Sequence, residues 1–86
     1  MVVKLTIHAR QALSKRGITE VLVEEILARP EWEVRDKRDP SLTRAFGQKS
    51  FDSQWIRVVF RILEDGDILV VTVHPDRDAV RPEKDS

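Results

Sequence analysis

Two runs of β-prone residues in the second half of the chain limit its fold more than any other feature. Residues 54–63 (QWIRVVFRIL) and 68–74 (ILVVTVH) are rich in valine, isoleucine and aromatic residues, and EDGD at 64–67 separates them. An Asp-Gly pair between two such runs is typical of a β-hairpin turn. The sequence therefore predicts an antiparallel hairpin over residues 54–74.

The first third of the chain has helical spacing and helix-capping residues. Thr6 is a suitable N-cap for a helix from about residue 7 to residue 16, and Gly17 is a suitable residue to end it. Thr19 can cap a second helix, which Pro30 would terminate. We therefore expect two consecutive helices before the hairpin.

Shorter β-prone segments surround these helices. Residues 2–5 predict a weak strand, and after Pro30 the residues alternate with a period of two over 32–35, followed by a weaker strand at 42–48. The expected fold class is α+β, with two N-terminal helices packed on one face of a three- to four-stranded antiparallel sheet. Residues 1–75 would form a single domain, and the polar residues 76–86 would form a flexible tail.

Composition limits the kinds of partner. The chain of 86 residues has 15 basic and 15 acidic residues, so nucleic-acid binding would need a local patch rather than an overall positive field. It has no cysteine, which excludes disulfides and thiolate metal sites and fits a cytoplasmic protein. No apolar run approaches the roughly 20 residues of a membrane span, and the N-terminal segment lacks a signal-peptide pattern, so no membrane partner is expected.

The hairpin register predicts a mixed face of the sheet. A turn of even length pairs Leu63 with Ile68, which sets three further pairs opposite each other: Arg61 with Val70, Val59 with Thr72, and Arg57 with His74. Trp55 lies on the same face. The other face is wholly apolar and is the predicted core face under the helices, formed by Ile56, Val58, Phe60, Ile62, Leu69, Val71 and Val73.

Two interpretations of the mixed face remain open. Two arginines, a histidine, a threonine and a tryptophan on one surface are suited to an anion with an attached ring. Alternatively, the arginine stems simply cover the apolar residues of an open sheet.

The first predicted helix contains a second candidate group. His8 falls at its second position, where the helix dipole favours the neutral imidazole that a general base requires. Lys15 lies on the same side of the helix as His8. The alternative is a histidine at the helix boundary with a structural hydrogen bond. Arg16 falls within the apolar arc and is predicted to bond to Glu20 or Glu24.

Three segments resemble a known family. HARQALSKRGIT (8–19), IRVVFR (56–61) and TVHP (72–75) are similar to the family catalogued as domain of unknown function 4258. That family is similar to the small bacterial ribonuclease toxins, which include barnase-like and RelE-like domains, so the resemblance implies a metal-independent ribonuclease. This chain departs from the family's pattern at Ala12, where an arginine is usual, and at His74, where a tyrosine is common.

Two functional hypotheses follow. In the first, the domain cleaves RNA with His8, His74 and Arg57 as catalytic residues, and substrate is bound by Arg61, Lys15, Trp55 and Thr72. This mechanism requires both histidines on one face, and it uses neither a metal nor a cofactor. In the second, the domain is a non-catalytic module that binds an antitoxin-like protein or forms a homodimer through the mixed face.

Overall fold

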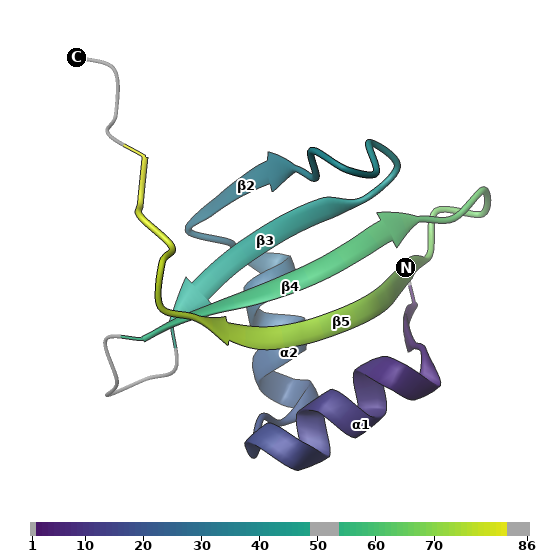
Figure 1. The fold of residues 1–86 in the computed structure, drawn as a ribbon. Helices are drawn as coiled ribbons and strands as arrows, with labels where there is room; N and C mark the ends of the chain where they lie inside the picture. Colours follow the sequence, from purple (N-terminus) through teal and green to yellow (C-terminus); the bar gives the residue numbers. More distant parts are fainter. Residues whose placement is uncertain (1, 49–53, 83–86) are drawn as a thin grey trace.

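The computed structural model describes residues 2–48 and 54–82. Within these residues, five strands and two helices follow one another along the chain. Figure 1 shows both helices on one side of the sheet. They are β1 (Val3–Leu5), α1 (Ile7–Arg16), α2 (Glu20–Ala28), β2 (Trp32–Arg35), β3 (Thr43–Gln48), β4 (Trp55–Ile62) and β5 (Ile68–Asp76). The α+β class with two helices on one side of a sheet is confirmed.

The sheet differs from the prediction in strand number and direction. It has five strands in the order β1-β5-β4-β3-β2, and it is mixed because β1 runs parallel to β5. The predicted three- to four-stranded antiparallel sheet is therefore wrong in these details. Ile68 donates its backbone N–H to the Val2 carbonyl over 2.9 Å, and the Val2 N–H is bonded to a carboxylate oxygen of Asp67 over 2.9 Å. This pairing joins segments more than sixty residues apart, and the local sequence pattern does not encode it.

Both helices begin and end where their capping residues predict. The Thr6 hydroxyl accepts the Ala9 N–H at 3.0 Å, and the Thr19 hydroxyl accepts the Leu22 N–H at 3.1 Å. Gly17 has a φ of 65°, a left-handed conformation that glycine adopts without strain and that ends α1. Local sequence thus determines the limits of α1 and the start of α2.

The contact between the two helices was predicted for the wrong arginine. Arg16 is exposed, whereas Arg10 Nη1 lies 3.1 Å from Glu20 Oε1. Arg16 lies in the last turn of α1, where the chain leaves the helix through Gly17. An ideal helical wheel places it beside the apolar residues but does not show that this last residue of the helix is exposed.

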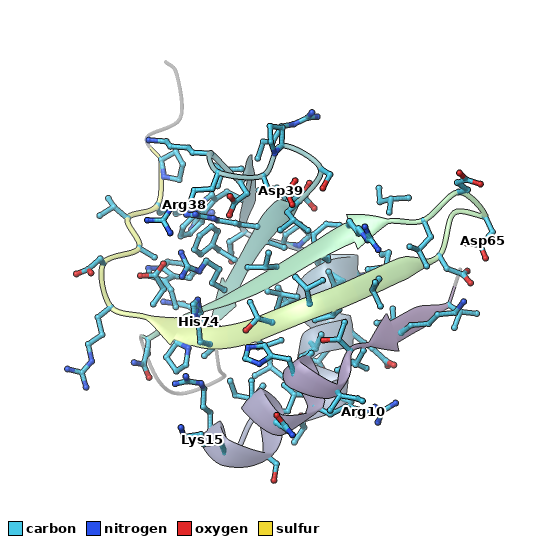
Figure 2. The ribbon with its side chains drawn as sticks, turned by 45° about the vertical axis from the view of Figure 1, so that its right-hand side comes forward. Arg10, Lys15, Arg38, Asp39, Asp65 and His74 are labelled. Atoms are coloured by element: carbon cyan, nitrogen blue, oxygen red, sulfur yellow. The ribbon has the colours of Figure 1, made fainter. Side chains whose placement is uncertain are left out.

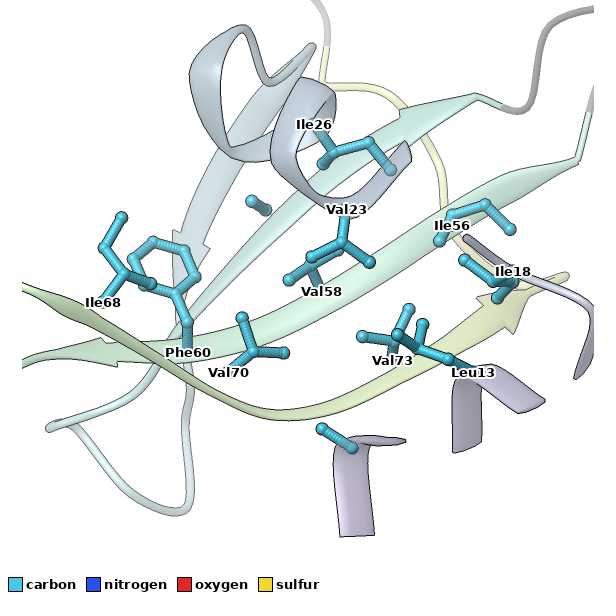
Figure 3. Packing of buried hydrophobic residues seen from close by; sticks show 12 residues of the cluster. Leu13, Ile18, Val23, Ile26, Ile56, Val58, Phe60, Ile68, Val70 and Val73 are labelled. Carbon is cyan, nitrogen blue, oxygen red and sulfur yellow. The ribbon is translucent and has the colours of Figure 1, made fainter. Parts of the chain in front are cut away.

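The core lies between the helices and one face of the sheet (Figure 3). Gly47 of β3 allows α2 to approach closely, because a Cβ atom there would lie 2.6 Å from Cγ1 of Ile26. The buried cluster consists of Ala9, Leu13, Ile18, Val23, Ile26, Ala45, Ile56, Val58, Phe60, Ile68, Val70 and Val73.

The predicted hairpin register is wrong near the turn. Ile68 pairs with Ile62 rather than with Leu63, and Arg61 does not pair with Val70. The reason is the loop, which spans residues 63–67 and includes Gly66 at a φ of 88°. This loop contains one residue more than the even turn assumed from the sequence.

A β-bulge restores the predicted register farther from the turn. The pairing shifts between Val59 and its β4 neighbour Phe60, which leaves Val71 of β5 as the extra residue. Beyond the bulge, Val59 pairs with Thr72 and Arg57 pairs with His74, as predicted. The longer loop and the bulge therefore compensate for each other.

The bulge also changes which β5 residues face the helices. Ile68 and Val70 belong to the buried core, although the even register assigned them to the other face. Ile62, a predicted core residue, is 68% exposed. Strand β5 ends at Asp76, so the predicted domain boundary at residue 75 falls within it.

Candidate functional site

The sheet face opposite the helices carries most of the candidate residues, and we call it the open face. Along each strand, the side chains of this face alternate with side chains that are buried in the core. Across the strands, register aligns Trp32 with Phe46, Phe46 with Arg57, and Arg57 with His74. The open face is defined by Trp32, Arg44, Phe46, Trp55, Arg57, Val59, Arg61, Thr72, His74 and Asp76.

Arg57 on β4 contacts His74 and Asp76, which lie on the same face of β5. Its Nε lies 2.7 Å from Nε2 of His74, and its Nη2 also contacts that nitrogen. Its Nη1 lies 3.5 Å from Oδ2 of Asp76. The side chains of Arg57 and Asp76 are only 22% and 17% exposed, so the pair is partly shielded from water. One guanidinium thus links an imidazole and a carboxylate on the open face.

Burial and these contacts together determine the protonation state of His74. A guanidinium can only donate hydrogen bonds, so Nε2 must be the acceptor and the proton of the neutral ring lies on Nδ1. Partial burial, followed by the charge of Arg57 and the more distant charges of Arg16 and Arg44, lowers the pKa of His74, while Asp76 opposes the shift. His74 is therefore a neutral imidazole near pH 7, with Nε2 occupied by Arg57.

Two further arginines lie on the open face beside carboxylates of the loop between β2 and β3. Arg44 Nε lies 3.0 Å from Oδ2 of Asp36. Backbone N–H groups of Asp39 and Arg38 lower the pKa of Asp36, with a further contribution from Arg44. Arg61 is exposed, and its charge helps to lower the pKa of Asp39, after the larger effect of hydrogen bonds from Ser41. The positive charge of this face is therefore largely balanced by nearby aspartates.

Three aromatic rings lie next to this charged group. Trp32 is stacked on Phe46 with ring centroids 4.5 Å apart and an interplanar angle of 11°. Trp55 meets Trp32 edge to face, with centroids 4.7 Å apart and an angle of 74°. Phe46 is 4% exposed, and both tryptophans are half-buried. The open face thus combines an aromatic region on β2, β3 and β4 with a polar region on β4 and β5.

A separate hollow lies on the helix side of the sheet. Its volume is about 470 Å³, and its described lining includes Glu25, Arg29 and Glu31 around α2 and Gly47 on β3. None of its described lining residues belongs to the Arg57–His74 group. We place the candidate site on the open face because the perturbed imidazole and its charged partners are there.

The family comparison covers nearly all of this architecture. A family model described as Domain of unknown function (DUF4258) matches residues 5–75. The chain belongs to the DUF4258 family. No curated protein and no solved structure matches it, so the likeness to ribonuclease toxins stays a prediction.

The DUF4258 fold brings together some of the sequence-predicted site residues. Arg57 and His74 are in contact, while Thr72 and Trp55 lie on the same face at neighbouring positions of β5 and β4. Arg61 occupies the same face of β4 nearer the turn. These five residues come from the predicted hairpin, whose pairing at Arg57 and His74 was correct.

His8 and Lys15 lie elsewhere. Both are exposed residues of α1, which packs through Ala9 and Leu13 against the core face. His74 follows the buried Val73 on β5 and projects from the opposite face (Figure 2). The structure does not bring the two histidines together, so a mechanism that uses both imidazoles is not supported.

The structure adds residues that sequence reasoning did not select. Asp76 was expected in the flexible tail, and no role was assigned to Trp32, Phe46 or Arg44. Asp76 lies near Arg57 because β5 pairs with β4, and the other three residues lie near it because β2, β3 and β4 pair in register. The alternation of Trp32 and Val34 was the one available signal, because it places Trp32 on a definite face of a strand.

Within residues 2–48 and 54–82, no group of three or more histidine, aspartate or glutamate side chains is placed to hold a metal ion. In the same part of the chain, no helix is long and apolar enough to cross a membrane.

Proposed function

We propose that this DUF4258 domain is an endoribonuclease that cleaves RNA at the open face without a metal ion. The observation that carries the proposal is the contact of Arg57 with His74 beside Asp76. A guanidinium suits the charge of a phosphate, and a neutral imidazole suits removal of a proton from a ribose hydroxyl. Both groups lie on one accessible face of the sheet.

The apo contact defines the first step. Nε2 of His74 accepts a hydrogen bond from Arg57, so it cannot take a proton until the guanidinium moves. A bound phosphate offers Arg57 a charged acceptor in place of the neutral imidazole, and charge-assisted hydrogen bonds are the stronger ones. Substrate binding would therefore transfer Arg57 to the phosphate and free Nε2.

The chemical step is an internal transesterification. His74 Nε2 takes the proton of the 2′-hydroxyl, O2′ forms a bond to phosphorus, and the bond from phosphorus to O5′ breaks. Arg57 stabilises the charge that develops on the phosphoryl oxygens. The leaving O5′ takes a proton from water, because His8, the second histidine of the chain, lies on the helix side. The products are a 2′,3′-cyclic phosphate and a 5′-hydroxyl.

The test is cleavage of single-stranded RNA in the presence of EDTA. We expect His74→Ala and Arg57→Ala to lower the rate by about 10²- to 10⁴-fold, the usual contribution of general acid–base catalysis. His8→Ala is the matched control and should stay within about twofold of wild type by the same reasoning. Wild type that leaves RNA intact, or a His74→Ala variant at full rate, would contradict the proposal.

A second function is favoured by the charge balance of the open face. Asp36 and Asp76 offset Arg44 and Arg57, and two half-buried tryptophans lie among them. Tryptophan and arginine are the residues that most often anchor protein interfaces. A non-catalytic module that binds a protein partner or a second copy would use the same face. Light scattering over a range of concentrations tests the homodimer, because only this alternative gives a doubled mass.

A further inference from the structure

All of the tryptophan in the chain lies in one place on the open face. The sequence contains two tryptophans and no tyrosine. Trp32 of the edge strand β2 and Trp55 of β4 meet above β3, where Phe46 is stacked against Trp32. Three strands that are separate in the sequence thus contribute one ring each.

The rings adjoin the guanidinium of Arg57. Phe46 is the direct β3 partner of Arg57, so their side chains are neighbours on the open face. Trp55 precedes Arg57 by two residues on β4, a separation of about 7 Å along a strand. An aromatic surface and a cation therefore lie at adjacent positions, in the combination that the base and the phosphate of one nucleotide require.

The packing of the cluster leaves ring surface available. A stacked contact uses one face of each ring, and an edge-to-face contact uses a face of only one ring. The contacts among Trp32, Phe46 and Trp55 therefore do not use every ring face. Both tryptophans retain partial exposure, whereas Phe46 is 4% exposed beside them. The available aromatic surface thus belongs to the two tryptophans.

We propose that Trp32 and Trp55 form a binding site for one unpaired nucleobase, beside a phosphate held by Arg57. The inference rests on the proposed ribonuclease function for its choice of RNA as ligand. A base stacks on an aromatic side chain only when it has left its own helix, so this site selects single-stranded over duplex RNA. Trp32 is then a specificity-determining residue on a strand that contributes nothing else to the site.

Intrinsic fluorescence tests this site directly, because both fluorescent indoles belong to it. The probe is a non-cleavable 2′-O-methyl oligonucleotide of mixed sequence, added either as a single strand or annealed to its complement. We expect the single strand to quench the emission, and the duplex to bind at least about fivefold more weakly, given about 1–3 kcal/mol for stacking of one base. Inorganic phosphate alone should leave the emission unchanged.

Two substitutions at one position separate stacking from folding. Trp32→Ala should weaken binding of the single strand by about fivefold or more, which is the effect of losing one stacked base. Trp32→Phe keeps a ring and should retain most of the affinity. If Trp32→Ala fails to fold, the comparison of single strand with duplex on wild type still decides the question.

The outcomes distinguish this inference from the ribonuclease proposal. Equal affinity for single strand and duplex, or unchanged binding by folded Trp32→Ala, would overturn the base site. A doubled mass with emission that changes with protein concentration would show that a second copy occupies the face, and would also overturn it. Quenching without RNA cleavage would support the base site and contradict the ribonuclease proposal. Cleavage without quenching would support the ribonuclease proposal and contradict the base site.

Discussion

At the scale of single residues, the protonation of His74 depends on its neighbours from several elements. Arg57 on β4 and Asp76 on β5 act on it at close range, and Arg16 on α1 and Arg44 on β3 act through their charges. Burial is the largest cause of the lowered pKa of His74, and Arg57 is the next. Protonation of the ring would place two cations in contact and remove the acceptor that Arg57 uses.

The first prediction concerns Arg57→Gln. Loss of the guanidinium removes a nearby positive charge and a donor to the neutral ring, so the pKa of His74 should rise toward its ordinary value. Burial stays, so the recovery should be incomplete. A titration of the imidazole resonances by NMR measures the change, with His8→Gln as the background that leaves one histidine to assign. An unchanged pKa of His74 in Arg57→Gln would show that the guanidinium does not control this ring.

The lowered pKa of His74 makes the free energy of unfolding depend on pH. The pKa of His74 in the folded chain lies below the ordinary value of 6.5. As the pH falls below about 6.5, the unfolded chain therefore takes up a proton before the folded chain does, and the free energy of unfolding decreases. The free energy of unfolding should stop decreasing once the pH lies below the pKa that His74 has in the folded chain. Above about pH 6.5 the ring is neutral in both states and His74 adds no pH dependence.

At the scale of elements, Thr6 joins α1 to the irregular part of the sheet. Its hydroxyl accepts the Ala9 N–H at 3.0 Å and donates to the Val71 carbonyl at 3.2 Å, while its own N–H donates to the Val70 carbonyl at 3.0 Å. Val71 is the bulged residue of β5. The residue that starts the helix thus also bonds to the strand where its register shifts.

The second prediction compares the two helix caps. Thr6→Ala removes both a cap and a bond to β5, whereas Thr19→Ala removes a cap that is exposed to solvent. We expect Thr19→Ala to lower the free energy of unfolding by about 1 kcal/mol and Thr6→Ala to lower it by about 2 kcal/mol. Urea denaturation measures both values. Thr6→Ser keeps the hydroxyl and serves as the control, and equal losses for the two alanine variants would contradict a role of Thr6 at the bulge.

At the scale of the whole molecule, charge balance limits how the domain could hold RNA under the proposed function. The chain has 15 basic and 15 acidic residues, and the same balance recurs locally where Arg44 and Arg57 are paired with Asp36 and Asp76. A domain of this kind does not attract nucleic acid through a general positive field. Under the proposed function, RNA binding would have to come from a few specific contacts, including the proposed aromatic ones.

The third prediction follows from this balance. Affinity for the non-cleavable single strand should fall only gently with salt, with a slope of log K against log[salt] between about −0.7 and −2, because about 0.7 is expected for each phosphate contact. Arg57→Gln should reduce the magnitude of the slope by about 0.7. Lys15→Gln, on the exposed side of α1, is the matched control and should leave it unchanged. A steep slope, or an equal effect of Lys15→Gln, would place the RNA outside the open face.

Features that depend on neighbouring residues could be predicted from the sequence alone. Thr6, Gly17 and Thr19 determine where the helices begin or end, because caps and left-handed glycines act within one turn. The hairpin over 54–74 was also predictable from its turn residues and alternation, whereas the predicted facing of Arg57 and His74 is correct only because the bulge offsets the longer loop. Family membership was predictable from short motifs near both ends of the matched region.

Features that depend on distant segments could be seen only in the folded chain. The parallel pairing of β1 with β5 and the bulge at Val71 need partners that local periodicity does not specify. The aromatic cluster needs three strands in register, and the separation of His8 from His74 depends on which face α1 covers. Candidate residues for the chemistry could be proposed from the sequence, but the pairing of the strands determines which of them share a surface. Side chains two residues apart on a strand lie on the same face of the sheet, whereas the side chains of a packed helix lie on its other side.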